Sequence, residues 1–271
     1  MDQSPYTLAD LLRIMERLRD PDHGCPWDLA QDFRSIVPST LEECYELAAA
    51  IEAGDFDHVA DELGDVLFQV VFYAQLGREQ ELFDFSAVVE NLCAKLVRRH
   101  PHVFADGAIE GIVDERSDTG QVKERWEAIK AGERAGRAQH GALDDVPVNL
   151  PALPRAQKLQ KRAARVGFDW SEVAPVFAKL EEEIGELRQA VGEGDSASME
   201  EELGDVLFTL VNLARHLHLD SETALRRSSS KFEARFRAME RIAAKREEQL
   251  EDLDEEALDQ LWEQAKERIS D

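Results

Sequence analysis

The sequence predicts an all-α protein made of two related helical domains. Apolar residues recur three and four positions apart along most of the chain, which is the spacing of amphipathic helices, and no strand signal of any length is present. The segment from Glu62 to Phe68 recurs unchanged from Glu202 to Phe208, which indicates an internal duplication. We therefore expect a first domain over residues 1–130, a linker over 131–154 and a second domain over 155–271.

The chain is strongly acidic. Its 271 residues include 57 Asp and Glu against 32 Lys and Arg, which gives a formal net charge of −25. This balance argues against a nucleic-acid polymer or an anionic membrane as a partner, because both attract clustered basic residues. The three cysteines form no CxxC pair, so neither a disulfide framework nor a zinc site is expected. The sequence shows neither the pattern of a signal peptide nor an apolar run long enough to span a membrane, so we expect the protein in the cytoplasm.

The first expected helix follows Thr7, a suitable N-cap, and carries a stripe of apolar residues as far as Leu18. It ends near Asp20, and a turn-rich loop then leads to Trp27. Trp27 suits either a buried anchor for this loop or a surface that stacks on a base. The preference of Trp for packed sites favours the anchor.

An acidic helical hairpin follows in the first domain. Its first helix begins near Pro38, and Gly54 and Asp55 supply a helix stop and a cap for the return helix. A third amphipathic helix covers residues 85–99 and ends with basic residues. The apolar positions that we expect to be buried are Leu41, Cys44, Tyr45, Ala48, Val59, Leu63, Val66, Leu67, Val70, Val71, Val88, Val89, Leu92 and Leu96.

The segment after this helix holds two histidines around a proline. An extended residue before proline spreads His100 and His102 apart, and no third ligand lies nearby in the sequence, so a structured turn is favoured over a metal site. Residues 105–120 are rich in Gly and Asp. The apolar spacing over residues 122–129 predicts a further helix.

The second domain opens with a basic helix in an otherwise acidic chain. Its charges suit either a solvated face or an anion-binding surface, and the spacing leaves both open. They are Arg155, Lys158, Lys161, Arg162 and Arg165. An aromatic loop with Phe168 and Trp170 ends this helix. Further helices are expected over residues 173–191, 196–218, 222–248 and 254–269.

Each hairpin carries four carboxylates at positions that match 140 residues apart. In the second hairpin, Glu183 and Glu186 share one helix face, as do Glu202 and Asp205 on the next helix. Both pairs lie about 10–12 Å from the hairpin turn, so the four side chains face one another. The equivalents in the first hairpin are Glu43, Glu46, Glu62 and Asp65.

A cation is the natural partner of such a quartet. Like charges held together raise one another's pKa unless something neutralises them. Carboxylate oxygens without a nearby Cys or His are the ligands of hard ions, so we expect Mg2+, with Mn2+ as a substitute, and a substrate that supplies phosphate oxygens. A single Glu is more often part of a solvated face. The spacing kept in both copies argues against that explanation here.

Two other interpretations use the same carboxylates. A di-iron bundle requires a Glu-x-x-His pattern, and Asp65 and Asp205 stand where that histidine would be. A non-catalytic helical adaptor or regulatory nucleotide-binding protein would use the acidic hairpins to bind a partner. Such a protein would not require equal carboxylate spacing in both copies, so we favour the metal site.

Short motifs accompany the carboxylates along nearly the whole chain. They are Gly24 to Asp28, Arg98 to Phe104, Gln160 to Ala163 and Val166 to Trp170. With these motifs and the pattern EExxE, a spacer and ExxD, the chain resembles the two-domain bacterial form of MazG-type nucleoside triphosphate pyrophosphohydrolases. The resemblance implies an all-α homodimer that uses Mg2+ to hydrolyse nucleoside triphosphates to monophosphate and pyrophosphate, with attack at the α-phosphorus.

We expect the second copy to perform most of the turnover, because Lys179 stands there at the position of Ser39 in the first copy. Its expected metal ligands are Glu183, Glu186, Glu202 and Asp205. The expected catalytic residues are Glu182, Glu183, Glu186 and Lys231. Glu182 suits a base near the metal and a plain surface residue equally well. The expected substrate-binding residues are Lys158, Lys161, Arg162, Lys179, Glu182, Glu201, Lys231, Arg235 and Trp262.

The first copy keeps its acidic positions, and two bases on its third helix match Lys231 and Arg235. A second site that binds metal or nucleotide for regulation or assembly would consist of Glu43, Glu46, Glu62, Asp65, Lys95 and Arg99. Each hairpin is a small body with wide apolar faces. Pairing these faces between subunits would complete a four-helix arrangement, which predicts a homodimer.

Overall fold

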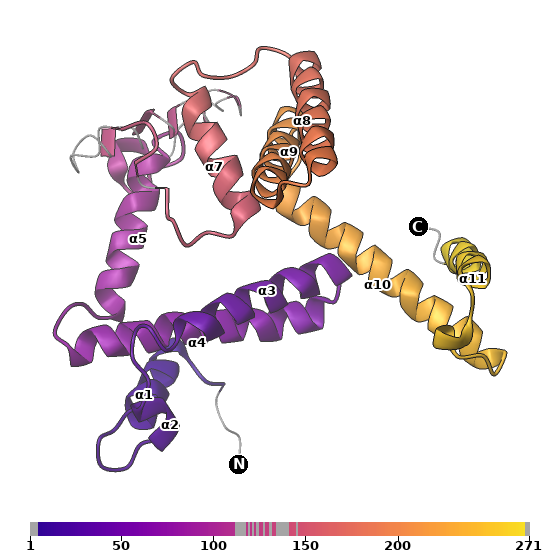
Figure 1. The fold of residues 1–271 in the computed structure, drawn as a ribbon. Coiled ribbons are helices and arrows are strands. Elements are labelled where there is room, and N and C mark those ends of the chain that lie inside the picture. The colour runs from indigo at the N-terminus through magenta and orange to yellow at the C-terminus, as the bar shows by residue number, and fades with distance from the viewer. Residues whose placement is uncertain are drawn as a thin grey trace. The chain divides into compact units, whose positions relative to one another are not determined.

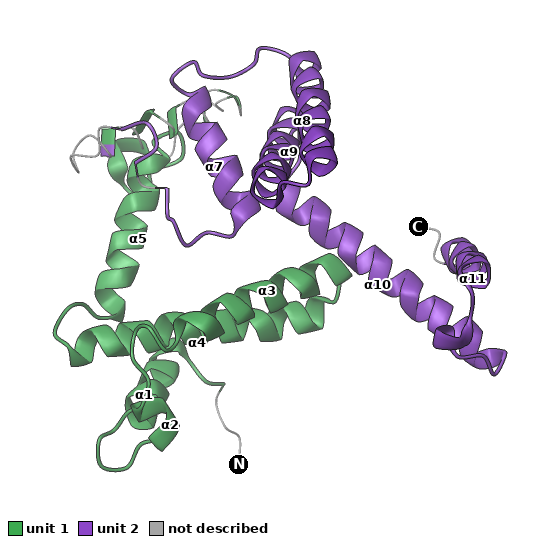
Figure 2. Cartoon of the chain, viewed as in Figure 1, with its two compact units in different colours: residues 1–132 green, residues 133–271 purple. Residues whose placement is uncertain are grey.

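The computed structural model describes residues 5–111, 141–144 and 146–268, together with isolated positions between 118 and 133. Over these residues every regular element is a helix and no strand is present, which confirms the predicted all-α class (Figure 1). The chain divides into two compact units, residues 1–132 and 133–271 (Figure 2). None of the described helices combines the length and the low polarity needed to cross a membrane.

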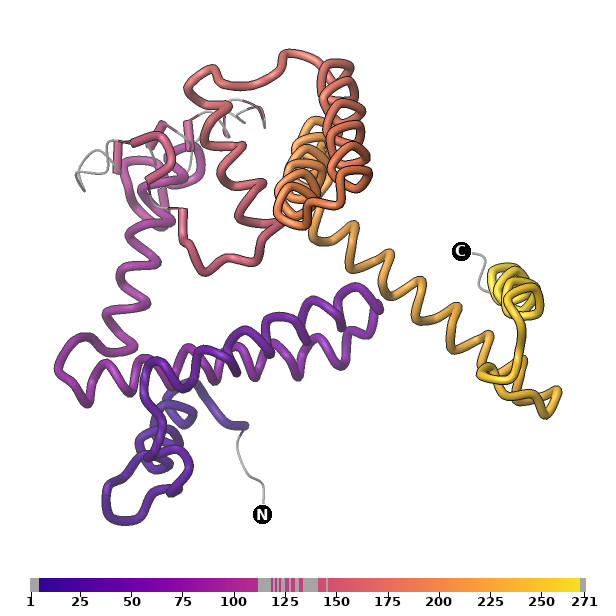
Figure 3. The backbone as a smooth tube through the Cα atoms, in the orientation of Figure 1, coloured from indigo at the N-terminus to yellow at the C-terminus, as the bar shows by residue number. Residues whose placement is uncertain are grey.

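The first unit is built around a helical hairpin. Its elements are α1 (Leu8–Leu18), α2 (Pro26–Leu29), α3 (Val37–Ala53), α4 (Phe56–Glu79), α5 (Phe85–Arg99) and the 3-10 helix η1 (Ala105–Gly107). Helices α3 and α4 run side by side, and α1 packs against α4 (Figure 3). The turn between α3 and α4 requires Gly54, whose φ of 72° lies in the left-handed region that favours glycine. Asp55 then caps α4 by accepting from the backbone N–H of His58.

The core of the first unit lies at one end of this hairpin. It consists of Met15, Ile36, Val71, Phe72 and Leu76, all at most 2% exposed. Arg19 is buried beside this cluster, with its guanidinium 5.2 Å from the centre of the Phe72 ring. Arg19 also donates two hydrogen bonds to Glu79, at 2.8 and 2.7 Å, and so ties the end of α1 to the end of α4.

Most of the apolar face that we expected to be buried in the first unit is exposed. Leu41 is 52% exposed, Leu63 is 53% exposed and, of the whole predicted set, only Val71 is fully buried. Trp27 is also 58% exposed, so its expected role as a buried anchor is wrong. The physical reason is the same for the hairpin positions: within the described chain, α1 and α5 cover only part of α4, and the remaining stripe has no apolar partner.

The second unit repeats the hairpin and adds helices on both sides. Its elements are α7 (Ala152–Ala164), α8 (Val173–Glu193), α9 (Ser196–His216), α10 (Ser221–Lys245), the 3-10 helix η2 (Leu250–Asp252) and α11 (Glu255–Arg268). These agree with the predicted helices within a few residues. Helix α7 begins at Ala152, so the last three residues of the expected linker belong to its first turn. Much of that linker, and part of the helix expected over 122–129, lies outside the described residues.

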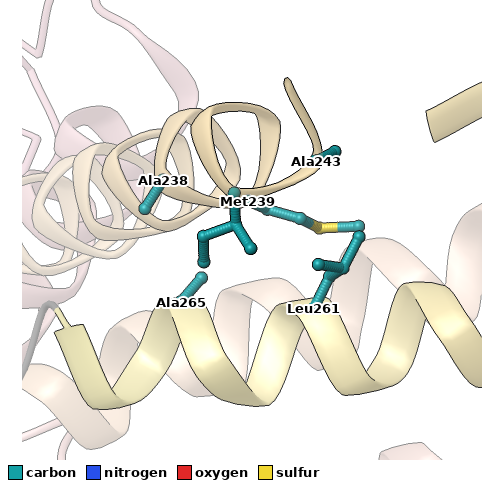
Figure 4. Close-up of a cluster of buried hydrophobic side chains, with 6 residues drawn as sticks. Ala238, Met239, Ala243, Leu261 and Ala265 are labelled. Carbon is teal, nitrogen blue, oxygen red and sulfur yellow. The ribbon is translucent and has the colours of Figure 1, made fainter. Parts of the chain in front are cut away.

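The core of the second unit lies between α10 and α11. Leu261 and Ala265 of α11 face Ala238 and Met239 of α10, and Ile242 and Ala243 complete the cluster (Figure 4). A second contact joins α7 to α9, where the buried Gln160 donates to the carbonyl oxygen of Phe208. Leu203 and Leu207, at apolar positions of α9, are 49% and 47% exposed. The second hairpin therefore has an uncovered apolar stripe like that of the first.

Candidate functional site

The second hairpin brings three predicted metal ligands together. Carboxylate oxygens of Glu183 on α8 and of Glu202 and Asp205 on α9 all lie within 4.8 Å of one another. Glu183 is 5% exposed, so its charge is largely removed from water. The spacing of three residues between Glu202 and Asp205 places both on the face of α9 that meets α8. These three residues form what we call the second acidic cluster.

Glu186, the fourth expected ligand, adjoins this cluster. Burial raises the pKa of Glu186, and the negative charge of Glu202 and a hydrogen bond with Glu183 raise it further. The shift thus combines burial with the negative charge of the neighbouring carboxylates.

Lys179 neutralises part of the second acidic cluster. Its ammonium lies 2.7 Å from Oε1 of Glu182 and 2.8 Å from Oε1 of Glu183. Hydrogen bonds to these two carboxylates raise the pKa of Lys179, so the side chain stays charged near neutral pH. The contact follows from helical spacing, since Lys179 precedes the two glutamates by three and four residues. Glu182 itself is exposed beside the cluster, as is Glu201 on α9.

The first hairpin holds an equivalent group, the first acidic cluster. Carboxylate oxygens of Glu43, Glu62 and Asp65 lie within 4.8 Å of one another, and burial followed by the charge of Asp65 raises the pKa of Glu43. Here the neighbouring base is His58, whose Nε2 lies 2.7 Å from Oε1 of Glu62. Our reading of the sequence missed His58, although its spacing of four residues from Glu62 on one helix was a usable signal.

Both clusters fit a hard divalent cation. All donors are carboxylate oxygens, which Mg2+, Mn2+ and Ca2+ prefer over nitrogen or sulfur. In the first cluster, Oε2 of Glu62 is buried and has no hydrogen-bond partner among the described residues, although Glu62 is only 6% exposed. A buried carboxylate oxygen without a partner is costly unless a cation or donor reaches it. The donor set and this orphaned atom together indicate a metal site.

The predicted phosphate-binding bases lie on a different helix from the cluster. Lys231 and Arg235 occupy α10, and within the described chain neither makes an ion pair. Nε of Arg235 is buried there without a hydrogen-bond partner among the described residues. Among the residues that the structure describes, no hydrogen bond or ion pair joins these two bases to the carboxylates of the second acidic cluster. In the first unit, Lys95 and Arg99 hold the corresponding places on α5.

Trp262, which we expected to bind substrate, is partly buried against α10. Its ring packs against Phe232 of α10 with centroids 5.3 Å apart, and it joins the core between α10 and α11. The bases of α7 divide by burial: Arg162 is 9% exposed, Lys158 is half-buried, and Lys161 is exposed with Asp220 nearby. The buried position of Arg162 means that α7 is more than a solvated basic face.

The chain matches known proteins along both hairpins. The family model for the MazG nucleotide pyrophosphohydrolase domain matches it twice, over residues 31–104 and 172–239. The chain belongs to this family. Each matched segment contains one complete acidic hairpin and part or all of the helix that carries the paired bases. The family assignment thus confirms the resemblance seen in the sequence and establishes the tandem arrangement of two helical domains.

Relatives similar to this chain carry the corresponding names. A protein of Escherichia coli (strain K12) named nucleoside triphosphate pyrophosphohydrolase is 53% identical over 260 residues, which cover 94% of this chain and 95% of that protein. A protein of Thermotoga maritima named nucleoside triphosphate pyrophosphohydrolase/pyrophosphatase MazG is 42% identical over 266 residues, or 98% of both chains. The similarity therefore spans both units rather than one hairpin.

Proposed function

We propose that this protein hydrolyses nucleoside triphosphates to nucleoside monophosphate and pyrophosphate, with Mg2+, chiefly at the second acidic cluster. The observation that carries the proposal is the convergence of Glu183, Glu202 and Asp205 within 4.8 Å in a member of the MazG family. The names of its relatives support the choice of substrate and reaction.

Glu183, Glu186, Glu202 and Asp205 would hold the metal. A divalent ion bound by such carboxylates polarises phosphate oxygens and lowers the pKa of a bound water. The helices α8 and α9 supply all four carboxylates from one hairpin, so their positions are set by helix packing and not by a loop. Rigid placement of this kind is what an in-line attack requires.

The bases and the remaining carboxylate supply the rest of the chemistry. Lys179 already holds its ammonium against the cluster and can exchange one carboxylate for a phosphate oxygen. Lys231 and Arg235 offer charge for the polyphosphate tail. Glu182 is exposed beside Glu183 and accepts the proton of the attacking water. The water oxygen joins the α-phosphorus, and the bridging oxygen of the broken anhydride leaves with pyrophosphate.

The first acidic cluster has a different role in this proposal. It keeps the carboxylates but pairs Glu62 with a histidine, and it has Ser39 where Lys179 stands in the second. A cluster without the lysine binds a cation without positioning a triphosphate. We assign it to metal binding that supports assembly of the homodimer.

The homodimer rests on the uncovered apolar stripes. Leu63 and Leu67 on α4, and Leu203 and Leu207 on α9, are between 40% and 53% exposed. A contiguous apolar stripe on a helical hairpin is stable in water only when another surface covers it. A second copy of the same hairpin supplies a matching stripe and completes a four-helix bundle.

Product analysis tests the reaction. Pure protein is incubated with a panel of nucleoside triphosphates and Mg2+, with EDTA in a parallel sample, and the products are separated by ion exchange. Monophosphate and pyrophosphate, both lost with EDTA, are the expected products. If the products were diphosphate and orthophosphate, the attack would be at the γ-phosphorus and the proposed reaction would be wrong.

A further inference from the structure

The first hairpin carries a histidine beside its acidic cluster. His58 lies in the first turn of α4, where its backbone N–H donates to Oδ1 of the cap residue Asp55 at 3.1 Å. Its ring extends toward the cluster, with Nε2 2.7 Å from Oε1 of Glu62. The cap therefore fixes the backbone of His58, while its side chain, which is 56% exposed, has room to change rotamer.

The spacing of His58 suits a ligand that shares an ion with Glu62. His58, Glu62 and Asp65 follow one another at intervals of four and three residues, which places them on one stripe of α4. Residues four apart on a helix can bind one ion together, as the two histidines of an H-E-x-x-H motif do. Two neighbouring ligands of one ion are about 3 Å apart when each lies about 2.1 Å from it. The 2.7 Å between Nε2 and Oε1 is close to that separation.

The other oxygen of Glu62 indicates a cation at this place independently of the number of acidic residues. Glu62 is 6% exposed, and its Oε2 is buried without a hydrogen-bond partner among the described residues. A carboxylate oxygen of Glu62 lies within 4.8 Å of oxygens of Glu43 and Asp65. Removing an unpaired carboxylate oxygen from water is costly, and a bound cation offsets that cost.

The bases beside the two clusters differ in whether they can bind a metal. The ammonium of Lys179 has three donors and no acceptor, so it cannot be a ligand, whereas a neutral imidazole has a lone pair on one ring nitrogen. The residue 140 positions after His58 is Ser198, and its Oγ donates to Oδ2 of Asp195 at 2.9 Å. At this position the first cluster thus has a nitrogen ligand and the second has none.

A nitrogen ligand changes which metals a carboxylate site prefers. Carboxylate oxygens suit Mg2+, whereas an imidazole nitrogen suits the divalent first-row transition ions, which bind nitrogen more strongly than Mg2+ does. An imidazole also fills a ligand position that a Mg2+ site shares with phosphate oxygens of the substrate. A cluster with its own imidazole therefore holds an ion without help from a nucleotide.

We propose that the first acidic cluster binds a divalent first-row transition ion, with or without nucleotide, and that Nε2 of His58 is one of its ligands. The other ligands are Glu43, Glu62 and Asp65. The inference rests on the proposed function for the use of the first cluster as a metal site, and it adds the class of metal and a further ligand. The two hairpins then hold different metals: the second takes Mg2+ together with the substrate, and the first keeps its ion on its own.

Metal titration of His58→Ser, which introduces the residue of the second copy, tests the proposed ligand. The full chain carries Glu202→Gln and Asp205→Asn to disable the second cluster, and Co2+ alone or Mg2+ alone is titrated by calorimetry without nucleotide. We expect Kd for Co2+ to rise at least tenfold and Kd for Mg2+ to change less than threefold, because only the transition ion gains much from a nitrogen ligand. His218→Ser, at an exposed position outside both clusters, is the matched control and leaves both Kd values unaltered.

The ratio of the two Kd values separates a ligand from a positioning residue. Equal rises for Co2+ and Mg2+ would mean that His58 only orients Glu62 through its hydrogen bond, and this result overturns the proposed ligand, as does a Kd for Co2+ that His58→Ser leaves unchanged. Glu62→Gln in the same background should abolish binding of both metals. Binding of Co2+ that survives Glu62→Gln would place the ion elsewhere and overturn the site.

Proton NMR of the Co2+-loaded protein gives a second readout that does not depend on affinity. A histidine bound to paramagnetic Co2+ shows a strongly shifted signal from its remaining ring N–H, which disappears in D2O. We expect one such signal in the chain with the second cluster disabled and none in His58→Ser. Its absence at saturating Co2+ overturns the inference. Pyrophosphate release with Mg2+ is measured separately on the chain with both clusters intact, so the inference and the proposed function can fail independently.

Discussion

Lys179 and His58 contact the two acidic clusters with different chemistry. The Lys179 ammonium bridges Glu182 and Glu183 and stays charged at neutral pH, whereas the ring of His58 contacts Glu62 alone. Lysine is also a common phosphate ligand. The two copies thus share a pattern of carboxylates and differ in the base beside it. Because Lys179 lies only in the second copy, we propose that the second copy performs most of the turnover.

The sequence identified the carboxylates but not all of their neighbours. Helical spacing predicted that Glu202 and Asp205 share one face of their helix. The distance of Glu183 from the hairpin turn then predicted that it lies opposite them, as the structure shows. Helical spacing was not enough for Gln160 or Phe72, whose positions depend on how α7 and α1 pack against the hairpins. The pairing of Trp262 with Phe232 was missed for the same reason, since it depends on the turn between α10 and α11.

The ion pair between Arg19 and Glu79 predicts a pH-dependent contribution to stability. Hydrogen bonds from Arg19 hold the pKa of Glu79 below its ordinary value of 4.5. A lowered folded-state pKa stabilises the protein above the unfolded-state pKa, and this stabilisation is lost as the pH falls through the folded-state value. Glu79→Gln therefore costs about 1.5 kcal/mol of unfolding free energy at pH 7 and much less at pH 3, measured by urea denaturation.

Glu16→Gln is the matched control for that experiment. Glu16 pairs with Arg78 on the same two helices, but both side chains are more than 40% exposed, and exposed pairs contribute little. An equal loss of stability in the two variants, or a loss for Glu79→Gln that is the same at both pH values, would reject the role given to Arg19 and Glu79.

The helical hairpins are the elements that the sequence predicts best. Helix α8 begins at Val173 and α9 at Ser196, as expected, because Gly194 and Asp195 supply a helix stop and a cap that local sequence reveals. The short 3-10 helices η1 and η2 were not predicted, since so few residues carry no periodic signal. Helices that span several turns and have clear caps were therefore predicted from the sequence, and the short connecting helices were not.

Two glycines at the end of α8 predict opposite effects of the same substitution. Gly194 has a φ of 73°, which an L side chain rarely adopts, whereas Gly192 lies in the helix and a Cβ there meets nothing within 4 Å. Gly194→Ala lowers the unfolding free energy by about 1 kcal/mol, and Gly192→Ala raises it by about 0.5 to 1 kcal/mol. Thermal unfolding of both variants checks this, and changes of the same sign would contradict the turn geometry.

At the scale of the whole molecule, the exposed apolar stripes are the main departure from expectation. The sequence indicates which residues of α4 and α9 are apolar, but not whether they are covered by the same chain or by another one. Leu63, Leu67, Leu203 and Leu207 remain largely exposed in a single chain. Periodicity therefore identifies an apolar face, but it does not show whether that face is buried or what covers it.

The proposed homodimer predicts twice the chain mass of 30.6 kDa in light scattering. Substituting both Leu203 and Leu207 by Glu places two charges in the apolar stripe of α9 and should shift the protein toward monomer or weaken its association at least tenfold. Val148→Glu adds charge at a position that is 75% exposed and outside the hairpins, so it serves as the control. A wild-type protein that is monomeric at micromolar concentration would contradict the proposed homodimer.

The central claim is that the second acidic cluster carries the turnover, and a matched pair of variants tests it most directly. Glu186→Ala and Glu46→Ala remove equivalent carboxylates 140 residues apart, and steady-state release of pyrophosphate from a nucleoside triphosphate is measured for each with Mg2+. We predict that Glu186→Ala reduces turnover about a hundredfold or more and that Glu46→Ala keeps most of it. Equal losses in the two variants, or a larger loss from Glu46→Ala, would contradict the assignment.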